Sequence, residues 1–342
     1  MTAQPPHYFD FTQEFQFTET MAGPVASMWQ HRQEGMFQGV DDLNIGWVSL
    51  TGYNHDKAII VVNGRVESYW KYQELFYDLI KQGYDVYALD HRGQGISDRL
   101  TPDTELGHVE EFDDYVSDLK TFFDTVVKPK GYLQHFMLGH SMGGTIATLF
   151  LAQYPTLIDS AVLSAPMHGI RVSNWMKPIA SPLARVVEQL RRQPDYAPGQ
   201  VPYYPKPFIG NPLCQSQVRY EWFRDLYENK PELKIGGPSA RWVWQGLAAA
   251  NRCIKQAAQI TTPILLLQGS ADHIVDNLAH LRFYRAMLQA DRPCQLKIIE
   301  GARHELLFEQ DQYRNPVLAA TLLHLNQNTL KRTAEPDKKA EV

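Results

Sequence analysis

The chain alternates short apolar runs with longer amphipathic stretches, and this alternation limits its fold more than any other feature. The apolar runs are rich in β-branched, leucine and aromatic residues and predict strands at 45–50, 57–64, 84–90, 134–140, 160–166, 263–270 and 294–301. Apolar residues at helical spacing predict helices at 68–83, 112–127, 144–154, 277–290 and 315–329. Apolar strands that alternate with helices are buried on both faces, so we expect an α/β fold with a mainly parallel sheet.

A long segment interrupts the alternation between Arg171 and Gln245. It contains 10 of the 21 prolines and 11 of the 39 aromatic residues, and its 11 basic residues exceed its 6 acidic ones. Its net charge is therefore +5, while the rest of the chain carries −10. A basic, aromatic insertion between two strands predicts a cap over a binding site; the alternative is an insertion without that role. The expected organisation is an N-terminal segment (1–40), a core (41–170 and 246–330), the cap (171–245) and a charged, disordered tail (331–342).

Overall composition narrows the class of protein. Of the 342 residues, 44% are hydrophobic and 21% charged, as in globular proteins that bury a core. The formal net charge of −5 gives no indication of nucleic-acid binding, and three distant cysteines fit no metal-ligand spacing and favour a reducing compartment. The N-terminus lacks the features of a secretory signal, and no run reaches the ~18 apolar residues that span a bilayer.

The sequence Gly139-His140-Ser141-Met142-Gly143 has the form G-x-S-x-G and stands between an apolar strand and a helical stretch. In this setting the serine lies on a sharp strand-to-helix turn that exposes it as a nucleophile. Glycine on either side lets strand and helix pack closely, and the helix N-terminus turns its partial positive charge toward the reacting atoms. The alternative is an ordinary tight turn. We predict that Ser141 is the nucleophile and that His140 is structural.

A nucleophilic serine needs a base to take its proton and an acid to orient that base. With this kind of turn, the acid and then the base follow the serine in chain order. Asp272 comes directly after one apolar strand, and His304 comes directly after the next. Because the carboxyl ends of parallel strands share one edge of the sheet, we expect Ser141, Asp272 and His304 to meet there.

Other residues compete for these two roles. Asp276 is a second candidate acid, but its place before a helical stretch favours a helix N-cap. His273 is adjacent to the predicted acid, and His280 and His324 lie inside helical stretches. His304 is the only histidine after the predicted acid that directly follows a strand, so it remains the predicted base.

The negative charge that develops on an attacked carbonyl needs two backbone N–H donors. We expect one from Met142, directly after the serine, and one from Arg65 in the loop 63–68, where Gly64 permits a tight turn. The Arg65 side chain can reach a substrate phosphate, or it can be an ordinary surface arginine paired with a carboxylate. A second glycine-rich loop, 90–97, lacks a phosphate-binding motif and is expected to pack near the strand-to-helix turn at Ser141, here called the elbow.

These residues together resemble the α/β-hydrolase superfamily, and within it the monoacylglycerol-lipase-like serine hydrolases and the bacterial inner-membrane lysophospholipases. The resemblance covers nearly the whole chain. It is carried by GVDD (39–42), GRVESYWKYQELFYDL (64–79), DHRGQGISDRL (90–100), LGHV (106–109), HSMGG (140–144), APMHGI (165–170), GGP (236–238), VDN (275–277) and HELLFE (304–309).

The resemblance implies a helical cap inserted after the sixth strand, and cleavage of the acyl ester of a lysophospholipid into a fatty acid and a glycerophospho compound. It also implies peripheral association with the cytoplasmic face of the inner membrane; the alternative is a soluble cytoplasmic protein. In monoacylglycerol lipases the oxyanion loop begins with His-Gly, whereas here it begins with Asn63-Gly64. The polar Asn63 is expected to preserve the backbone donor. No metal or cofactor is implied.

The cap composition fits an amphiphilic substrate. Its aromatic residues can line a slot for one acyl chain, and its basic residues can hold a phosphate or an anionic membrane surface. The candidate substrate-binding residues are Arg171, Trp175, Lys177, Arg185, Trp222 and Trp242. The alternative is that the aromatic residues only pack the cap and the arginines only face solvent.

The sequence therefore predicts a two-step acyl transfer through Ser141, His304 and Asp272. The nearest alternatives are a monoacylglycerol lipase, a general carboxylesterase or a proline iminopeptidase. The basic cap counts against the peptidase, which binds a free amine through acidic residues. A different class, a non-catalytic lipid-binding protein, commonly lacks one of the three residues, all of which are present here. Oligomeric state is left open by the sequence.

Overall fold

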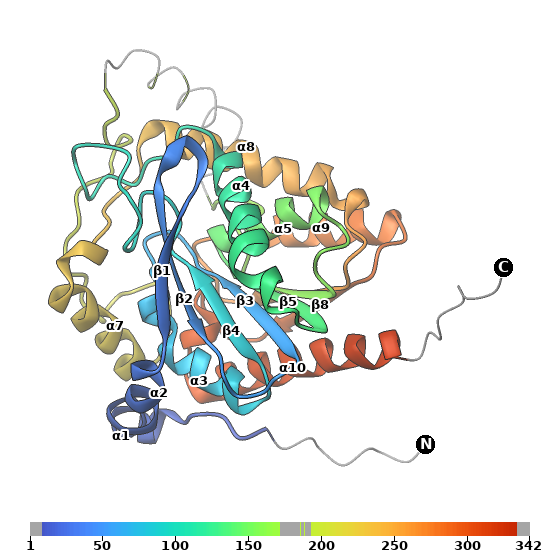
Figure 1. Cartoon of the computed structure of the whole chain (residues 1–342). Helices are drawn as coiled ribbons and strands as arrows, with labels where there is room; N and C mark the ends of the chain where they lie inside the picture. Colours follow the sequence, from blue (N-terminus) through green and yellow to red (C-terminus); the bar gives the residue numbers. More distant parts are fainter. Residues whose placement is uncertain (1–8, 172–184, 186–187, 189–192, 334–342) are drawn as a thin grey trace.

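The computed structural model describes residues 9–171, 185, 188 and 193–333, and these form an α/β structure around an eight-stranded sheet (Figure 1). The strand order is β1-β2-β4-β3-β5-β6-β7-β8. The β1–β2 and β2–β4 pairs are antiparallel, and every other pair is parallel. The strands are β1 (Gln33–Gln38), β2 (Asn44–Leu50), β3 (Lys57–Val62), β4 (Asp85–Leu89), β5 (Gln134–His140), β6 (Ser160–Ser164), β7 (Ile264–Gly269) and β8 (Cys294–Ile299).

The predicted α/β fold with a mainly parallel sheet is confirmed. The seven predicted strands correspond to β2 through β8, with ends that differ by no more than a few residues. Strand β1 was not predicted. Its sequence, QEGMFQ, is mostly polar because it forms the edge of the sheet, where four of its six residues are exposed and none is fully buried.

Helices cover both faces of the sheet (Figure 1). On one face lie α3 and α10, while α4, α5, α8 and α9 form the layer on the other, where α5 packs between α4 and α8. The five predicted helices correspond to α3, α4, α5, α9 and α10. The longer helices are α3 (Gln73–Lys81), α4 (Phe112–Phe122), α5 (Met142–Gln153), α7 (Gln217–Asn229), α8 (Ala240–Lys255), α9 (Asn277–Gln289) and α10 (Asp311–Thr333); the short α1 (Phe17–Thr20) and α2 (Ala26–Gln30) precede the sheet.

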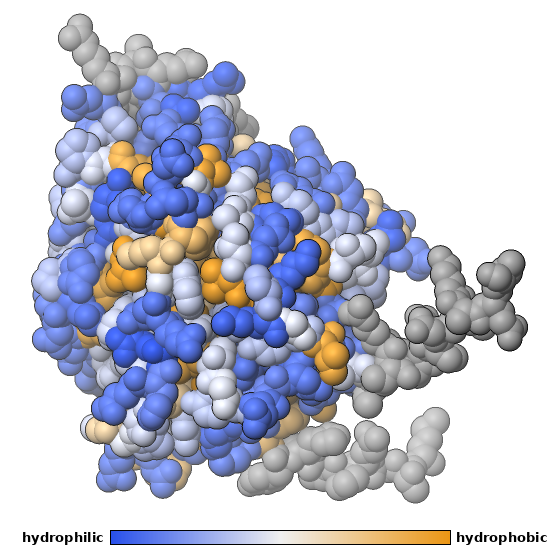
Figure 2. All heavy atoms as spheres, viewed as in Figure 1, coloured by the Kyte–Doolittle hydropathy of each residue, from blue (hydrophilic) through white to orange (hydrophobic). Residues whose placement is uncertain are grey.

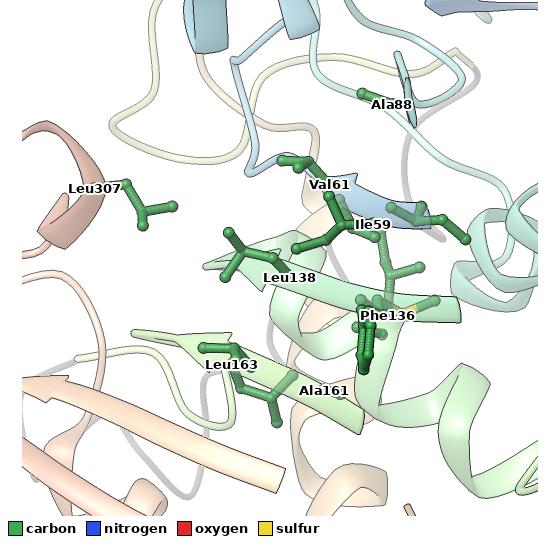
Figure 3. Close-up of a cluster of buried hydrophobic side chains, with 14 of the residues drawn as sticks. Ile59, Val61, Ala88, Phe136, Leu138, Ala161, Leu163 and Leu307 are labelled. Carbon is green, nitrogen blue, oxygen red and sulfur yellow. The ribbon is translucent and has the colours of Figure 1, made fainter. Parts of the chain in front are cut away.

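The core is centred on the inner strands β3, β5 and β6, where nearly every side chain is buried. Figure 3 shows part of the core, with side chains from neighbouring strands and Leu307 from the short helix 306–308. The labelled residues are Ile59, Val61, Ala88, Phe136, Leu138, Ala161, Leu163 and Leu307. Each buried Val, Leu, Ile or Phe side chain contributes roughly 1.5–3 kcal/mol. Strands β5 and β7, which precede Ser141 and Asp272, are therefore firmly held.

The chain between β6 and β7 contains α7 and α8. Helix α8 packs against α5 and α9, and residue 245, the predicted end of the cap, lies inside this helix. Helix α7 packs against α1. Figure 2 shows a mainly hydrophilic face on which apolar residues form small, separate patches. Among the helices that the structure describes, none has the length and apolar character that crossing a bilayer requires.

Candidate active site

Ser141 lies at a sharp turn between the end of β5 and the first residue of α5, as predicted. Its backbone has φ 53° and ψ −117°, in a region that residues other than glycine rarely adopt. The turn is held by hydrogen bonds from the Ser141 N–H to the Ser164 carbonyl and from the Met167 N–H to the Ser141 carbonyl. A Cβ atom at Gly143 would lie 2.1 Å from the Val62 carbonyl oxygen, so this position requires glycine.

Three predicted side chains meet at this turn. His304 Nδ1 lies 2.7 Å from Asp272 Oδ2, and His304 Nε2 lies 3.0 Å from Ser141 Oγ. Asp272 and His304 are almost completely buried, whereas Ser141 is partly accessible. With its ring proton on Nδ1, His304 donates to the carboxylate and accepts from the serine hydroxyl. The arrangement allows the serine proton to move to Nε2 when Oγ attacks a substrate.

The second oxygen of Asp272 is also satisfied. Oδ1 accepts the backbone N–H groups of Ile274 at 2.7 Å and Val275 at 3.1 Å. Burial by itself raises the pKa of Asp272, but the hydrogen bond and charge of His304, together with the two N–H groups, outweigh it and lower the pKa. The carboxylate therefore stays ionised and can stabilise a positively charged His304.

The competing residues have other partners. The Asp276 carboxylate accepts the Leu278 N–H at 3.1 Å and caps α9, which confirms the predicted N-cap. His280 is buried, with Nε2 2.7 Å from the Pro166 carbonyl. His273 Nδ1 lies 2.6 Å from Arg171 Nη1, and His324 lies on α10 with Nε2 2.9 Å from Ser160 Oγ. None of these rings lies within hydrogen-bond distance of Ser141 Oγ in the described structure.

The loop after β3 lies beside the elbow, and both predicted oxyanion donors, Arg65 and Met142, line the same cavity as Ser141. The Gly64 N–H is already occupied, because it donates to Glu67 Oε2 at 2.5 Å. Val66 has a φ of 59°, which bends the loop sharply after Arg65.

The loop 90–97 packs against this oxyanion loop. Gln94 Nε2 donates to the carbonyls of Gly64 and Glu67, both at 2.8 Å. The buried Asp90 carboxylate accepts from Asn63, Ser68, Tyr69 and Ile96. Burial outweighs these hydrogen bonds and raises the pKa of Asp90 to about 6. The predicted packing of 90–97 near the elbow is therefore confirmed, and Asp90 fixes both loops.

A buried lysine joins the oxyanion loop to the loop of His304. Lys71 Nζ lies 2.7 Å from Glu67 Oε1 and 2.8 Å from Glu305 Oε2, and it lies 4.2 Å from the ring centroids of Phe223 and Phe308. Burial would lower the pKa of Lys71, but the charges of the two glutamates raise it. Glu305 directly follows the predicted base, so this one cation holds both sides of the site.

Ser141 opens into a cavity of about 990 Å³. Its walls come from the oxyanion loop, the elbow, residues 167–171, residues 197–213, α7, α8 and the loops after β7 and β8. Among the described lining residues, five are basic and two are acidic: Arg65, Lys71, Arg171, Lys206 and Arg224 against Glu67 and Glu305. Both acidic residues are paired with Lys71, which leaves an excess of positive charge.

Of the six predicted substrate-binding residues, two line the cavity, two lie outside the described residues and two lie elsewhere in the structure. Arg171 and Trp242 line the cavity, and Arg171 also donates to the Asp272 carbonyl at 3.2 Å. Trp175 and Lys177 lie outside the described residues. Trp222 is a correction: it is not among the described lining residues, because its ring packs edge-on against Phe17, 6.1 Å between centroids.

Arg185 is a second correction. It is exposed, with its guanidinium carbon 5.2 Å from the Trp244 ring centroid, and it does not belong to the described cavity wall. Sequence reasoning also missed Lys71, Glu67 and Glu305. The i, i+4 spacing of Glu67 and Lys71 was a usable signal for an ion pair. No local pattern indicated Glu305 as the second partner.

Comparison with known proteins gives consistent matches. A model of the family described as Serine aminopeptidase, S33 matches residues 53–311. Lysophospholipase L2 of Escherichia coli strain K12 is 39% identical over 93% of this chain and 94% of that protein, and human monoglyceride lipase is 30% identical over 82% and 86%. The solved structure of a soluble variant of Saccharomyces cerevisiae monoglyceride lipase with a substrate analogue has a TM-score of 0.66 at 20% identity, covering 87% of this chain and 96% of that one.

Proposed function

This chain belongs to the α/β-hydrolase family described as Serine aminopeptidase, S33, and we propose that it is a serine hydrolase that cleaves the acyl ester of lysophospholipids. The products are a fatty acid and a glycerophospho compound. The observation that carries the proposal is the hydrogen-bonded series Ser141, His304 and Asp272 at the wall of a basic cavity. The 39% identity to lysophospholipase L2 over nearly the whole chain supports the choice of substrate.

The first half of the reaction acylates the serine. His304 Nε2 takes the Ser141 proton as Oγ attacks the acyl carbonyl, and Asp272 stabilises the resulting imidazolium. The backbone N–H groups of Arg65 and Met142 hold the oxyanion. The Gly64 N–H is not available for this purpose because Glu67 accepts it, which supports Arg65 as the donor. His304 then gives its proton to the leaving glycerol oxygen, and the C–O bond breaks.

The second half releases the fatty acid. Water enters the vacated position, gives a proton to His304 Nε2 and attacks the acyl-enzyme carbonyl. The tetrahedral intermediate collapses, Ser141 Oγ leaves with the proton from His304, and the free enzyme is restored. Every step uses these side chains, two backbone N–H groups and water.

The cavity suits a single-chain lipid. Its volume of about 990 Å³ is at the upper end of ordinary ligand pockets, which fits an acyl chain with a headgroup. Met167, Val243, Leu247 and Ile274 supply apolar wall for the chain. A peptidase that binds a free N-terminal amine requires available acidic groups; in the described lining both glutamates are bound to Lys71.

The rim of the cavity supports peripheral binding to the anionic cytoplasmic face of the inner membrane. Val201, Tyr204 and Ile209 line the cavity yet are 51%, 50% and 89% exposed, and Lys206 lies among them. Apolar side chains next to a cation can enter a headgroup layer, where each basic residue contributes roughly 1 kcal/mol. Co-sedimentation with anionic vesicles tests this. Ile209→Ser should weaken binding, and Leu133→Ser, which is 73% exposed but lies outside the cavity lining, should not.

The decisive test compares two substrates. Purified protein is given lysophosphatidylethanolamine or a monoacylglycerol of the same acyl chain, and fatty-acid release is measured. We expect the higher kcat/KM for the lysophospholipid and no more than trace release by Ser141→Ala. A higher kcat/KM for the monoacylglycerol would instead assign a monoacylglycerol lipase.

A fluorophosphonate separates an enzyme from a lipid-binding protein. It should label the wild-type serine, and labelling should disappear in Ser141→Ala and weaken strongly in His304→Ala. Absence of labelling in the folded wild-type protein would rule out the proposed mechanism.

A further inference from the structure

We propose that Arg65, Lys206 and Arg224 form a subsite inside the cavity that binds the phosphate of the substrate headgroup. The proposal rests on the proposed function, because it assigns the part of the lysophospholipid beyond the cleaved ester. All three residues line the cavity that Ser141 and His304 also line. They come from three separate segments: the oxyanion loop, the stretch before α7, and α7 itself.

The first observation is that these cations lack carboxylate partners. Among the described residues, the arginines that are at most 1% exposed are all paired: Arg92 with Asp118 at 2.7 Å, Arg219 with Glu74 at 2.9 Å and Arg314 with Asp78 at 2.7 Å. Within the described residues, no carboxylate lies within 4.0 Å of the charged nitrogens of the three subsite residues. Since an arginine held in a protein wall is ordinarily paired, Arg65 and Arg224 are available to an anionic ligand, and the exposed Lys206 adds a third charge at the rim.

The second observation is the way each side chain is held. The Arg224 guanidinium carbon lies 4.9 Å and 5.1 Å from the ring centroids of Tyr220 and Phe223, and its buried Nε has no hydrogen-bond partner among the described residues. The Arg65 guanidinium lies 5.3 Å from the Trp242 ring centroid and donates to the Gly236 carbonyl at 3.1 Å. Ring contacts, the Gly236 carbonyl and the side chains of Tyr203 and Tyr220 hold these two guanidinium groups, and the unpartnered Arg224 Nε leaves a donor for a ligand.

The third observation is electrostatic. Burial, followed by the charges of Arg224 and Arg65, lowers the pKa of Lys206, so both arginines lie within electrostatic range of this lysine. Burial also lowers the pKa of Arg65, to about 10. Burial would also lower the pKa of Arg224, but Tyr220, Tyr227 and the charge of Glu305 raise it, so this guanidinium stays charged. A bound phosphate removes the repulsion that acts on Lys206 and accepts charge-assisted hydrogen bonds.

The placement matches the geometry of a lysophospholipid. The proposed oxyanion donor is the backbone N–H of Arg65, so its side chain starts next to the reacting carbonyl. In the substrate only the glycerol unit separates the ester from the phosphate. A phosphate in contact with the Arg65 guanidinium therefore places the ester at Ser141, and Arg224 and Lys206 contact the same group from α7 and the rim.

The test measures selectivity with monomeric substrates. A lysophosphatidylethanolamine and a monoacylglycerol with the same short acyl chain are used below their micelle-forming concentrations. Arg224→Met and Lys206→Met should each lower the ratio of kcat/KM values, lysophospholipid over monoacylglycerol, about tenfold, and the double variant should lower it further. Arg285→Met removes an equal charge from the exposed surface of α9 and should leave the ratio unchanged. Equal losses on both substrates, or an unchanged ratio, would overturn the proposal.

A second measurement does not require the lysophospholipid to be a substrate. sn-Glycerol 3-phosphate should inhibit hydrolysis of the monomeric monoacylglycerol, glycerol should not, and Arg224→Met should raise the inhibition constant about tenfold. This outcome supports the phosphate subsite even if the preferred substrate is a monoacylglycerol. If glycerol 3-phosphate does not inhibit, and the variants lose activity only on vesicles, the three cations bind the membrane surface and the subsite proposal is wrong.

Discussion

Replacing Lys71 by methionine removes the charge that pairs with both Glu67, in the loop of the proposed oxyanion donor, and Glu305, in the loop of the proposed base. Lys71 is 2% exposed and contacts Glu67 on one side and Glu305 on the other. Glu67 in turn accepts the Gly64 N–H and the Tyr72 hydroxyl. Methionine fills similar space, so the change removes the charge rather than the packing.

The expected cost is large because two carboxylates lose their cation. Removing one partner of a buried ion pair costs about 3–5 kcal/mol, against a total stability of about 5–15 kcal/mol. Burial alone would raise the pKa of Glu67; the charge of Lys71 is the largest of the effects that lower it to about 2. Without Lys71 burial dominates and that pKa rises, so the folded variant favours the protonated carboxyl. The deficit in unfolding free energy should therefore shrink as the pH falls from 8 to 5.

Urea unfolding at pH 8 and pH 5 measures this deficit, and turnover of a soluble ester at low temperature measures the site. We expect Lys71→Met to lose about 3–5 kcal/mol at pH 8 and to lower kcat about tenfold while folded. Lys120→Met is the matched control: its pair with Asp124 on the surface of α4 and the following turn is worth less than about 1 kcal/mol. A loss below about 1 kcal/mol in Lys71→Met, or an unchanged kcat, would refute the reasoning.

Further predictions address the proposed acid, the elbow and the buried histidines. Asp272→Asn should lower kcat about 10³- to 10⁴-fold with an unchanged circular dichroism spectrum, because an amide cannot stabilise the imidazolium. Gly143→Ala should destabilise the fold by about 2 kcal/mol or more in urea, because its Cβ would meet the Val62 carbonyl, whereas Gly23→Ala has free space and should not. Burial lowers the pKa of three histidines to about 4: His91, His140 and His280. The unfolded chain therefore binds more protons below pH 6.5, so each should cost roughly 2 kcal/mol of stability at pH 5 relative to pH 7.5; unfolding free energies that are equal at the two pH values would contradict this.

The sequence predicted the parallel sheet and the close approach of Ser141, Asp272 and His304. Both follow from the alternation of apolar strands with helices. Apolar strands between helices fix a parallel arrangement, and residues just beyond the ends of β5, β7 and β8 then share one edge of the sheet. This is why Ser141, Asp272 and His304 lie together although 163 positions separate the first from the last. The family resemblance stated from the motifs is confirmed by the match over residues 53–311; the catalytic roles remain predictions.

The sequence could not predict features that depend on partners distant in the chain. Strand β1 has too few apolar residues to be recognised alone, since its stability comes from pairing with β2. Trp222 looks like any other aromatic residue of the insertion, and only the fold shows that Phe17 covers it. Lys71 lies in a helical stretch where a lysine is ordinarily exposed, and its burial follows from the positions of Glu67 and Glu305.

The charge of the cap also depends on partners that are distant in the chain. These partners determine where a phosphate subsite is expected. Counting residues gives the insertion a net charge of +5, but the count treats every cation as equivalent. Arg219 is bound by Glu74 and Asp311, and Arg241 by Glu110, so these charges stabilise contacts between the insertion and the core. Arg224 is only five positions from Arg219, yet it faces the cavity and has no carboxylate partner among the described residues. Ligand selectivity in such an insertion therefore depends on which cations the core leaves unpaired, and a change that supplies Arg224 with a carboxylate should lower selectivity for phosphate without altering the serine, histidine and aspartate.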